Sequence, residues 1–343
     1  FRPHRGCCVR DIILDGPNFL PYLRGMGSVL DAKHFRDEAA AYKWVEARVW
    51  PNGRVCPKCG EVDHSSPMQG KSTRIGVYKC YGCRKQFTVK VGTIFEDSHI
   101  KLHIWLQAMF LIASSKKGIS SNQLHRTLGI TLKSAWFLSH RIREAMKDSG
   151  TMFGGNFGGV EADETLQGIN PNYTAPVDGY AFNPWSYNRV LTLIDRDTGA
   201  ARSFVLTEFT TEEVQRIFNE NVAREAYLLT DEANQYKGPG SKQTFHGTTN
   251  HSAGEYVRKD APWVHTNTVE GYYSIFKRGM KGVYQHASRQ HLHRYCIEFD
   301  FRYTNRSKLG VDDVARFTKI VEGVKGKRLT YRTTGERSEV AAH

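Results

Sequence analysis

"NRVLTLIDRDTGAARSFVLTE" occupies residues 188–208 and predicts two apolar strands joined by a turn at residues 196–199. Aliphatic residues dominate both halves, and the Asp, Thr and Gly between them favour a tight turn. The stretch "GVEAD", residues 159–163, precedes this hairpin and predicts a short strand that ends at Asp163. Three consecutive strands indicate the first part of a β-sheet.

Beyond the hairpin the pattern alternates between helix and strand. "TEEVQRIFNENV", residues 211–222, predicts a helix with a capping box formed by Thr210 and Glu213. "AYLLTD", residues 226–231, predicts a buried strand that ends at Asp231.

Residues 232–264 are polar, with no obvious element for most of their length, and a helix that carries Glu270 follows them. We therefore expect an α/β domain over residues 151–308, with a mixed sheet and flanking helices, introduced by the glycine-rich segment 151–159.

Three carboxylates, Asp163, Asp231 and Glu270, can meet at one edge of this sheet, because the helix that carries Glu270 follows the second strand end and its first turn can face the same edge. Asp163 and Asp231 each follow an apolar strand, and strand ends are where α/β sheets bind ligands. Three ionised carboxylates within about 4 Å repel by roughly 4 kcal/mol per pair at a surface-like dielectric, which favours divalent metal between them. Hard oxygen ligands suit Mg²⁺ or Mn²⁺.

Other interpretations of these acids stay open. Glu270 can complete a capping box with Asn267 as N-cap, in addition to any catalytic role. Asp195 and Asp197 are expected to shape a turn, and Glu164 to point to the opposite face of its strand from Asp163. The remaining alternatives to the three carboxylates are Glu161 and Glu232.

Four of the seven cysteines form two C-x-x-C pairs, Cys56 with Cys59 and Cys80 with Cys83. Each pair can direct two thiolates at one ion, so the spacing predicts a structural Zn²⁺ ribbon. A redox motif or two disulfides are the alternatives. Gly60 and Gly82 are expected to supply unusual backbone angles in the two turns, and residues 85–95 a final strand. With a helix over residues 33–48, this region forms an expected unit 33–97.

A helical unit is expected over residues 98–150. Its helices cover residues 101–114, 120–128 and 132–147, and the short turn at Gly129 between the last two is typical of a helix-turn-helix. A three-helix connector with a solvated basic face is the alternative. The residues that we expect to contact DNA are Lys133, Ser134 and Arg141 here, with His140 and Arg143 also available, and Lys277, Arg278 and Lys281 after Glu270.

The chain has 343 residues, and 48 Lys and Arg against 35 Asp and Glu give a net charge of +13. Such an excess favours a polyanionic partner, nucleic acid before membrane. The longest apolar run near its middle is too short to cross a bilayer. Residues 1–32 are expected to be a disordered extension or the product of a mistranslated start, with Met26 as the natural start, and residues 309–343 a C-terminal tail.

Taken together, residues 33–308 resemble the DDE transposases of bacterial insertion sequences that carry an N-terminal zinc ribbon, the ISXO type related to eukaryotic Merlin elements. The motifs that carry the resemblance are "WPNGRVCPKCG", "YKCYGCRKQFTVKVGTIF", "ADET", "LLTDEANQY", "HTNTVEGYYSIFKRGMKGVY" and "HLHRYCIEFDFRYTNR". The resemblance implies a ribonuclease H-like fold and a catalytic triad of Asp163, Asp231 and Glu270 that holds two Mg²⁺ or Mn²⁺ ions.

It also implies a bacterial cytoplasmic protein that binds the terminal inverted repeats of its own element, cleaves DNA strands and joins them to target DNA, as a homo-oligomer. Residues 166–188 depart from the family's glycine- and lysine-rich loop, being aromatic and nearly uncharged, which leaves a dimer or end-recognition surface open. The rival functions are a non-catalytic DNA-binding regulator and a structure-selective nuclease of the same fold.

Overall fold

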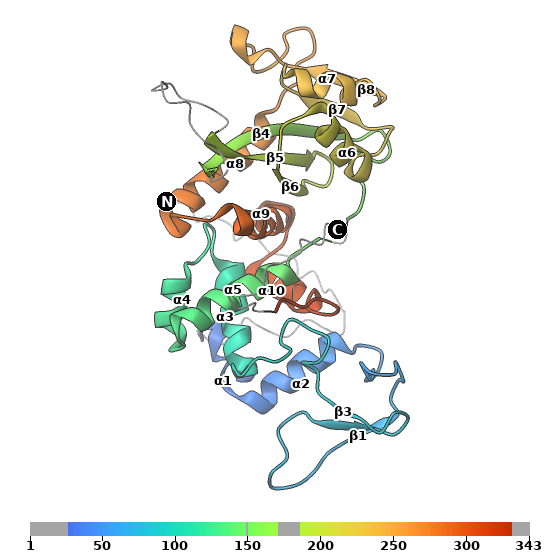
Figure 1. The fold of residues 1–343 in the computed structure, drawn as a ribbon, viewed down its shortest axis with the longest axis vertical. Helices are drawn as coiled ribbons and strands as arrows, with labels where there is room; N and C mark the ends of the chain where they lie inside the picture. Colours follow the sequence, from blue (N-terminus) through green and yellow to red (C-terminus); the bar gives the residue numbers. More distant parts are fainter. Residues whose placement is uncertain (1–26, 149, 171–185, 331–343) are drawn as a thin grey trace, which may run out of the picture.

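A computed structural model describes residues 27–148, 150–170 and 186–330. Three parts follow one another along the long axis of the molecule: a small cysteine-rich part, a helical part, and a sheet with its own helices (Figure 1). Residues 1–26 of the expected extension 1–32, most of the loop 166–188 and the end of the expected tail lie outside the described residues. Residues 27–32 correct that expectation, because they contain a capped helical turn, Val29–Asp31, and Val29 and Leu30 pack on the helical core. None of the described helices is long and apolar enough to cross a membrane.

The sheet has five described strands in the order β6-β5-β4-β7-β8. β5 pairs antiparallel with β4 and β6, whereas β7 runs parallel to β4 and β8 parallel to β7, so the sheet is mixed, as the sequence predicts. The strands are β4 (Gly159–Ile169), β5 (Tyr187–Asp195), β6 (Ala201–Leu206), β7 (Tyr227–Thr230) and β8 (Phe245–Thr248).

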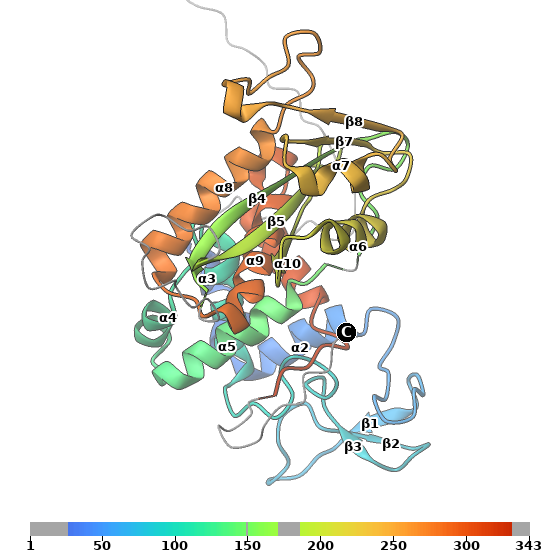
Figure 2. The same ribbon diagram turned by 45° about the horizontal axis from the view of Figure 1, so that its top comes forward.

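Helices cover both faces of this sheet (Figure 2). On one face, α6 (Thr211–Asn221) and α7 (Asn234–Gly240) share a hydrophobic core with Val160 and Ala162 of β4. On the other, α8 (Asn267–Gly279) and α9 (Arg289–Thr304) pack on Val190 and Ile194 of β5. The alternation of side chains along each strand produces these two separate cores.

Two expectations for this domain are wrong. β4 does not stop at Asp163 but continues to Ile169, because its largely polar second half also pairs with β5, with Leu166 opposite Arg189 and a register shift between Gln167 and Ile169. The polar segment 232–264 contains α7 and the edge strand β8. β8 is only four residues long and lacks an apolar pattern, so periodicity gives no signal for it.

The helical part packs around one core that draws on both ends of the described chain. The expected helix 33–48 is divided at Asp37, which has extended backbone and caps the second piece by accepting from the Ala40 amide at 2.7 Å. The helices are α1 (Lys33–Arg36), α2 (Glu38–Val49), α3 (Leu102–Ser114), α4 (Ser121–Leu128), α5 (Leu132–Ala145) and α10 (Asp313–Glu322).

Helix α10 corrects the expectation of a tail over residues 309–343. Its residues Phe317, Ile320 and Val321 are fully buried beside α3 and α2. The apolar residues of α10 have helical spacing in the sequence, so periodicity is a signal from which this helix can be predicted. Short helical turns complete the chain at Val29–Asp31, His251–Ala253, Met280–Tyr284 and Ser307–Leu309.

The cysteine-rich part is a three-stranded antiparallel sheet of β1 (Ser65–Pro67), β2 (Tyr78–Cys80) and β3 (Gln86–Phe87). The expected final strand over residues 85–95 is therefore only two residues long. The following residues Val89, Ile94 and Phe95 are buried in the helical core instead. The cysteine-rich part is thus an insertion between α2 and α3, rather than one unit with the N-terminal helices.

A buried ionic network joins α5 of the helical part to α9 of the sheet part. Arg143 of α5 donates to Glu298 of α9 at 2.7 Å, and Arg302 lies 2.6 Å from the same carboxylate. Burial alone would raise the pKa of Glu298, but Arg302 and Arg143 hold that pKa below its ordinary value. The two parts therefore meet through paired charges and not only through apolar contacts.

Candidate active site

Three carboxylates meet where β4 and β7 run side by side. Oxygens of Asp163, Glu164 and Asp231 lie within 4.8 Å of one another. Asp163 and Glu164 are adjacent in the middle of β4, and Asp231 directly follows β7, whose residue Leu229 is in register with Glu161 of β4. The parallel pairing of β4 with β7 thus brings Asp163 and Asp231 together, as strand ends at a common edge would do.

Glu164 reaches this cluster from the other face of the sheet. Its carboxylate accepts a hydrogen bond from Tyr236 of α7, in keeping with the alternation of side chains along β4. One of its oxygens nevertheless lies within the 4.8 Å group. The expectation that Glu164 faces away from Asp163 is therefore right for its packing but does not exclude it from the cluster.

Burial, followed by the charges of neighbouring acids, raises the pKa values of these three groups. Burial and then the charges of Glu164 and Asp231 raise the pKa of Asp163 to about 8. Burial raises the pKa of Glu164 to about 7, although the hydrogen bond from Tyr236 and the charge of Arg189 act in the opposite direction. Burial also raises the pKa of Asp231. Anionic oxygens in such number, with little positive charge beside them, are a donor set that suits a hard divalent cation.

Glu270 lies beside this group but outside it. Its carboxylate is 3.6 Å from His251 and 3.5 Å from the Thr266 hydroxyl. The charge of Glu270 adds the smallest of the contributions that raise the pKa of Asp163. His251 also faces Asp231 and lowers its pKa, so this histidine stands between two of the three expected carboxylates.

The expected capping box of Asn267 and Glu270 is wrong. Asn267 is the first residue of α8, and neither it nor Thr266 at the N-cap position makes a side-chain cap hydrogen bond. The amides of Thr268 and Val269 donate instead to Glu161 of β4, both at 2.9 Å. The carboxylate that caps the helix therefore comes from the sheet and leaves Glu270 available to the cluster.

The four cysteines of the two C-x-x-C pairs form a second candidate metal centre. Their sulfur atoms lie within 4.8 Å of one another, with 3.7 Å between Cys56 and Cys83 and 3.6 Å between Cys59 and Cys80. A tetrahedral site with Zn–S bonds of about 2.3 Å requires S–S separations of about 3.8 Å. The cluster fits a Zn²⁺ ion without rearrangement.

The unusual backbone angle expected in the turn of each cysteine pair is found at Gly60 but not at Gly82. Gly60, directly after Cys59, has a positive φ of 79°, as predicted. In the second turn the residue with positive φ is Arg84, at 58°, and not Gly82. Both left-handed residues directly follow the second cysteine of their pair.

The residues expected to contact DNA fall into two groups. Lys277, Arg278 and Lys281 are exposed at the end of α8 and just beyond it, and Lys133 and Ser134 lie at the start of α5 with Lys133 exposed. Arg141 is only 3% exposed and donates to the main-chain oxygens of Leu329 and Glu96. The burial of Arg141 removes it from the candidate DNA contacts, and it also removes the alternatives His140 and Arg143, which are buried in the same helix.

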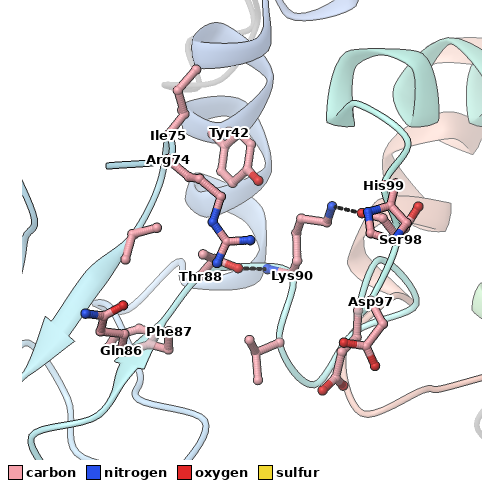
Figure 3. A pocket seen from close by; sticks show the side chains of 13 residues that line it. Tyr42, Arg74, Ile75, Gln86, Phe87, Thr88, Lys90, Asp97, Ser98 and His99 are labelled. Atoms are coloured by element: carbon pink, nitrogen blue, oxygen red, sulfur yellow. Dashed lines mark hydrogen bonds between the residues drawn. The ribbon is translucent and has the colours of Figure 1, made fainter. Parts of the chain in front are cut away.

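Among the hollows in the described surface, one adjoins the carboxylate cluster and another lies away from it. One, of about 570 Å³, is lined by Glu164, Arg189 and Lys277, so it adjoins the cluster on the side of the basic helix end. The other, of about 430 Å³, lies between the cysteine-rich part and the helical part, where Lys90 donates to the main-chain oxygen of Ser98 at 2.6 Å (Figure 3). The second hollow contains none of the carboxylates.

Sequence reasoning missed the residues that support the cluster. Tyr236 and His251 lie in the polar segment 232–264, where no periodic pattern marks them. Arg196 was assigned only to a turn, whereas it donates to Glu161 at 2.7 Å. An acid such as Glu161 in an otherwise apolar strand is a signal that can be found, because a buried carboxylate requires partners.

In this chain a four-cysteine ribbon and a helical part precede a mixed sheet with an acidic cluster. Residues 157–304 match the model of the ISXO2-like transposase domain, and residues 36–86 match that of the transposase zinc-ribbon domain. The chain therefore contains an ISXO2-like transposase domain preceded by a transposase zinc ribbon.

A relative in a known mobile element agrees with this assignment. The chain is 24% identical over 285 residues to an uncharacterized protein in transposable element ISH50 of Halobacterium salinarum. The match covers 80% of this chain and 93% of that protein. The resemblance stated from the sequence motifs is thus confirmed at the level of the family.

Proposed function

We propose that this protein is an active transposase that binds the terminal inverted repeats of its own element, cleaves the DNA strand at each end and joins the ends to target DNA. The observation that carries the proposal is the grouping of Asp163 and Asp231, with Glu270 beside them, on a mixed sheet. The order of three strands, a helix and a fourth strand supports a ribonuclease H-like fold for this domain.

Asp163, Asp231 and Glu270 are the residues that would hold two Mg²⁺ or Mn²⁺ ions, with Glu164 near enough to join them. Such ions, when bound, activate an attacking hydroxyl and stabilise the leaving oxygen in phosphoryl transfer. The raised pKa of Asp163 supports the fit, because carboxylates that resist ionisation together are stabilised by added positive charge. His251 and Thr266 would orient the Glu270 carboxylate.

The basic residues around the cluster would position the DNA. Lys277 lines the hollow that adjoins Glu164, two helical turns from Glu270, where it can bind a backbone phosphate. Arg278 and Lys281 extend the positive charge beyond it, and Lys133 and Ser134 lie at the start of the second helix of the helix-turn-helix. The ribbon and these helices would recognise the repeats, and two ends brought together require a homo-oligomer, at least a dimer.

The test is strand cleavage and joining by the purified protein, with Mg²⁺ or Mn²⁺, on DNA that carries the repeats flanking its gene. Asp231→Asn should abolish cleavage, by at least about a hundredfold, and leave specific binding to the repeats nearly intact, because the substitution removes a metal-binding charge without changing the shape of the site. Retained cutting would show that the wrong acids are assigned. Cutting without joining would indicate a nuclease, and binding without cutting a regulator.

A further inference from the structure

A buried carboxylate from the sheet holds the first turn of α8. Glu161 is 0% exposed, and its Oε2 accepts from the amides of Thr268 and Val269, each at 2.9 Å. The first amides of a helix have no partner within the helix, and their partial positive charge favours an anion. Since Thr266 makes no side-chain cap, Glu161 is the residue that satisfies this helix end.

Arg196 completes the arrangement from the turn between β5 and β6. Its Nε donates to Oε1 of Glu161 at 2.7 Å, and its two terminal nitrogens donate to the main-chain oxygens of Trp263 at 2.6 Å and His265 at 2.8 Å. Its own amide donates to the Gly159 oxygen at the start of β4. The segment that enters α8 is therefore tied to β4 at two points.

Glu161 and its bonding partners lie near each of the three carboxylates of the candidate active site. Glu161 stands two residues before Asp163 on the same face of β4, and its neighbour in β7, Leu229, stands two residues before Asp231. Glu161 also accepts a hydrogen bond from the amide of Val269, which directly precedes Glu270. The Glu161 side chain thus connects the segments that carry Asp163 and Glu270, and the backbone of Glu161 pairs with the strand that leads to Asp231.

We propose that Glu161, held by Arg196, is a positioning residue that sets the distance of Glu270 from Asp163 and Asp231 and so the affinity of these carboxylates for a divalent cation. The inference rests on the proposed function, because it concerns the same three acids. Partners of this kind behind a metal site commonly change metal affinity by about 10- to 100-fold when they are replaced.

A helix cap with no further role would have a different signature. Asp37 and Asp312 cap their helices from the N-cap position, over a few residues, and so stabilise only the local turn. Glu161 lies more than a hundred residues before the amides that donate to it, and it belongs to the sheet. Its loss would therefore release the start of the helix from the sheet. A plain cap predicts lower stability alone, whereas a positioning residue predicts weaker metal binding in a protein that stays folded.

The experiment measures Mn²⁺ binding calorimetrically in the zinc-loaded full-length protein, with Asp231→Asn to identify the binding that belongs to the cluster. The variants are Glu161→Ala, which removes the cap, and Glu161→Gln, which keeps one acceptor for the helix amides. Glu298→Gln is the matched control, since Glu298 is also a fully buried carboxylate paired with arginine, but lies between α5 and α9. Hydrogen exchange of residues 266–272 reports directly on the start of α8.

We expect Glu161→Ala to weaken Mn²⁺ binding at least about tenfold and to speed amide exchange at Thr268 and Val269. Glu161→Gln should weaken binding about threefold by the same mechanism and serves alone if the alanine variant does not fold. Glu298→Gln should lower the melting temperature and leave Mn²⁺ binding unchanged.

Unchanged Mn²⁺ binding in the folded Glu161 variants would overturn the inference, and so would an equal loss in Glu298→Gln. Wild-type protein without Asp231-dependent Mn²⁺ binding would overturn the inference together with the metal-binding part of the proposed function. A protein that binds Mn²⁺ through Asp231 and Glu161 as described but never cuts repeat DNA would overturn the proposed function alone.

Discussion

Asp163 is the residue whose protonation is most sensitive to its surroundings in the described structure of the site. Its pKa of about 8 follows from burial and from the charges of Glu164 and Asp231, so in the absence of metal the carboxyl is largely protonated at neutral pH. An unfolded chain has no such crowding, and the same group ionises there near pH 4. Protonation of Asp163 therefore links the stability of the metal-free protein to pH.

The sign of this linkage is opposite to that of a salt-bridged acid. A carboxyl whose pKa is raised by folding stabilises the folded state fully at acidic pH, and this contribution is lost as the pH rises from about 4 to about 8. Other groups add their own slopes, so the informative quantity is the difference from a variant. We expect the melting temperature of the metal-free wild type to fall relative to Asp163→Asn between pH 5 and pH 8.

Differential scanning calorimetry measures that difference. The buffer contains neither chelator nor divalent metal, and the protein keeps its bound zinc. Added Mn²⁺ should raise the melting temperature of the wild type more at pH 8 than at pH 6, because metal binding competes with the protons. A constant difference between wild type and Asp163→Asn across this pH range would contradict the assignment of the raised pKa to Asp163.

At the scale of elements, the zinc ribbon is a unit with a very small core. Tyr78 and Phe87 pack with Cys56 and Cys80, and Trp50 lies against them. So few apolar side chains cannot stabilise a domain without the metal, which contributes on the order of 10 kcal/mol in comparable small units. Val89, Ile94 and Phe95 belong to the helical core and do not depend on the cysteines.

Removal of zinc should therefore unfold a sharply bounded segment. We expect a zinc chelator to abolish protection from hydrogen exchange over residues 54–87, whereas α3 and the five-stranded sheet keep their protection. Exchange measured by mass spectrometry, with and without the chelator, tests this boundary. Loss of protection in β4 or α8 would show that the ribbon is required for the catalytic domain to fold.

Most elements of the chain could be predicted from the sequence because their periodicity is strong. The hairpin of β5 and β6, the helices α3 to α6 and the four-cysteine cluster all appear where the pattern places them. Two of the elements that were not expected, β8 and the second half of β4, are largely polar and owe their conformation to pairing with a neighbouring strand. Tertiary pairing of this kind leaves no local signal.

The candidate site shows the same division between local and tertiary information. Asp163 and Asp231 could be predicted because each follows apolar strand residues. The cap of α8 could not be predicted. Asn267 and Glu270 satisfy the local rule for a capping box, but the first amides of the helix donate instead to the carboxylate of Glu161, which is distant in the chain. A sequence rule for helix ends considers only neighbours along the chain.

At the scale of the whole molecule, the positive charge has a defined place beside the site. Lys277, Arg278 and Lys281 lie on one side of the sheet, whereas Arg216, Arg224 and Lys242 are exposed around α6 and α7 on the other. Each phosphate contact contributes about 0.9 to the slope of log affinity against log salt concentration. The two groups carry equal charge, so variants that remove one group or the other distinguish the effect of position from the effect of net charge.

Replacement of Lys277, Arg278 and Lys281 together by alanine should reduce the magnitude of that slope by about 2 to 3. The matched triple variant at Arg216, Arg224 and Lys242 should leave it within about 0.5 of the wild type. Fluorescence anisotropy with repeat DNA over a range of salt concentrations measures both. Equal effects of the two variants would mean that DNA responds to net charge and not to this surface.

Helix α10 has a consequence for how the protein is made. Its buried residues Phe317 and Ile320 pack with Phe35, near the other end of the described chain. During synthesis, the core of the helical part cannot form until residues beyond 320 have left the ribosome. All residues of the ribbon and the sheet have been synthesised by then. A gene copy truncated before this point would therefore produce a protein whose helical part cannot complete its core.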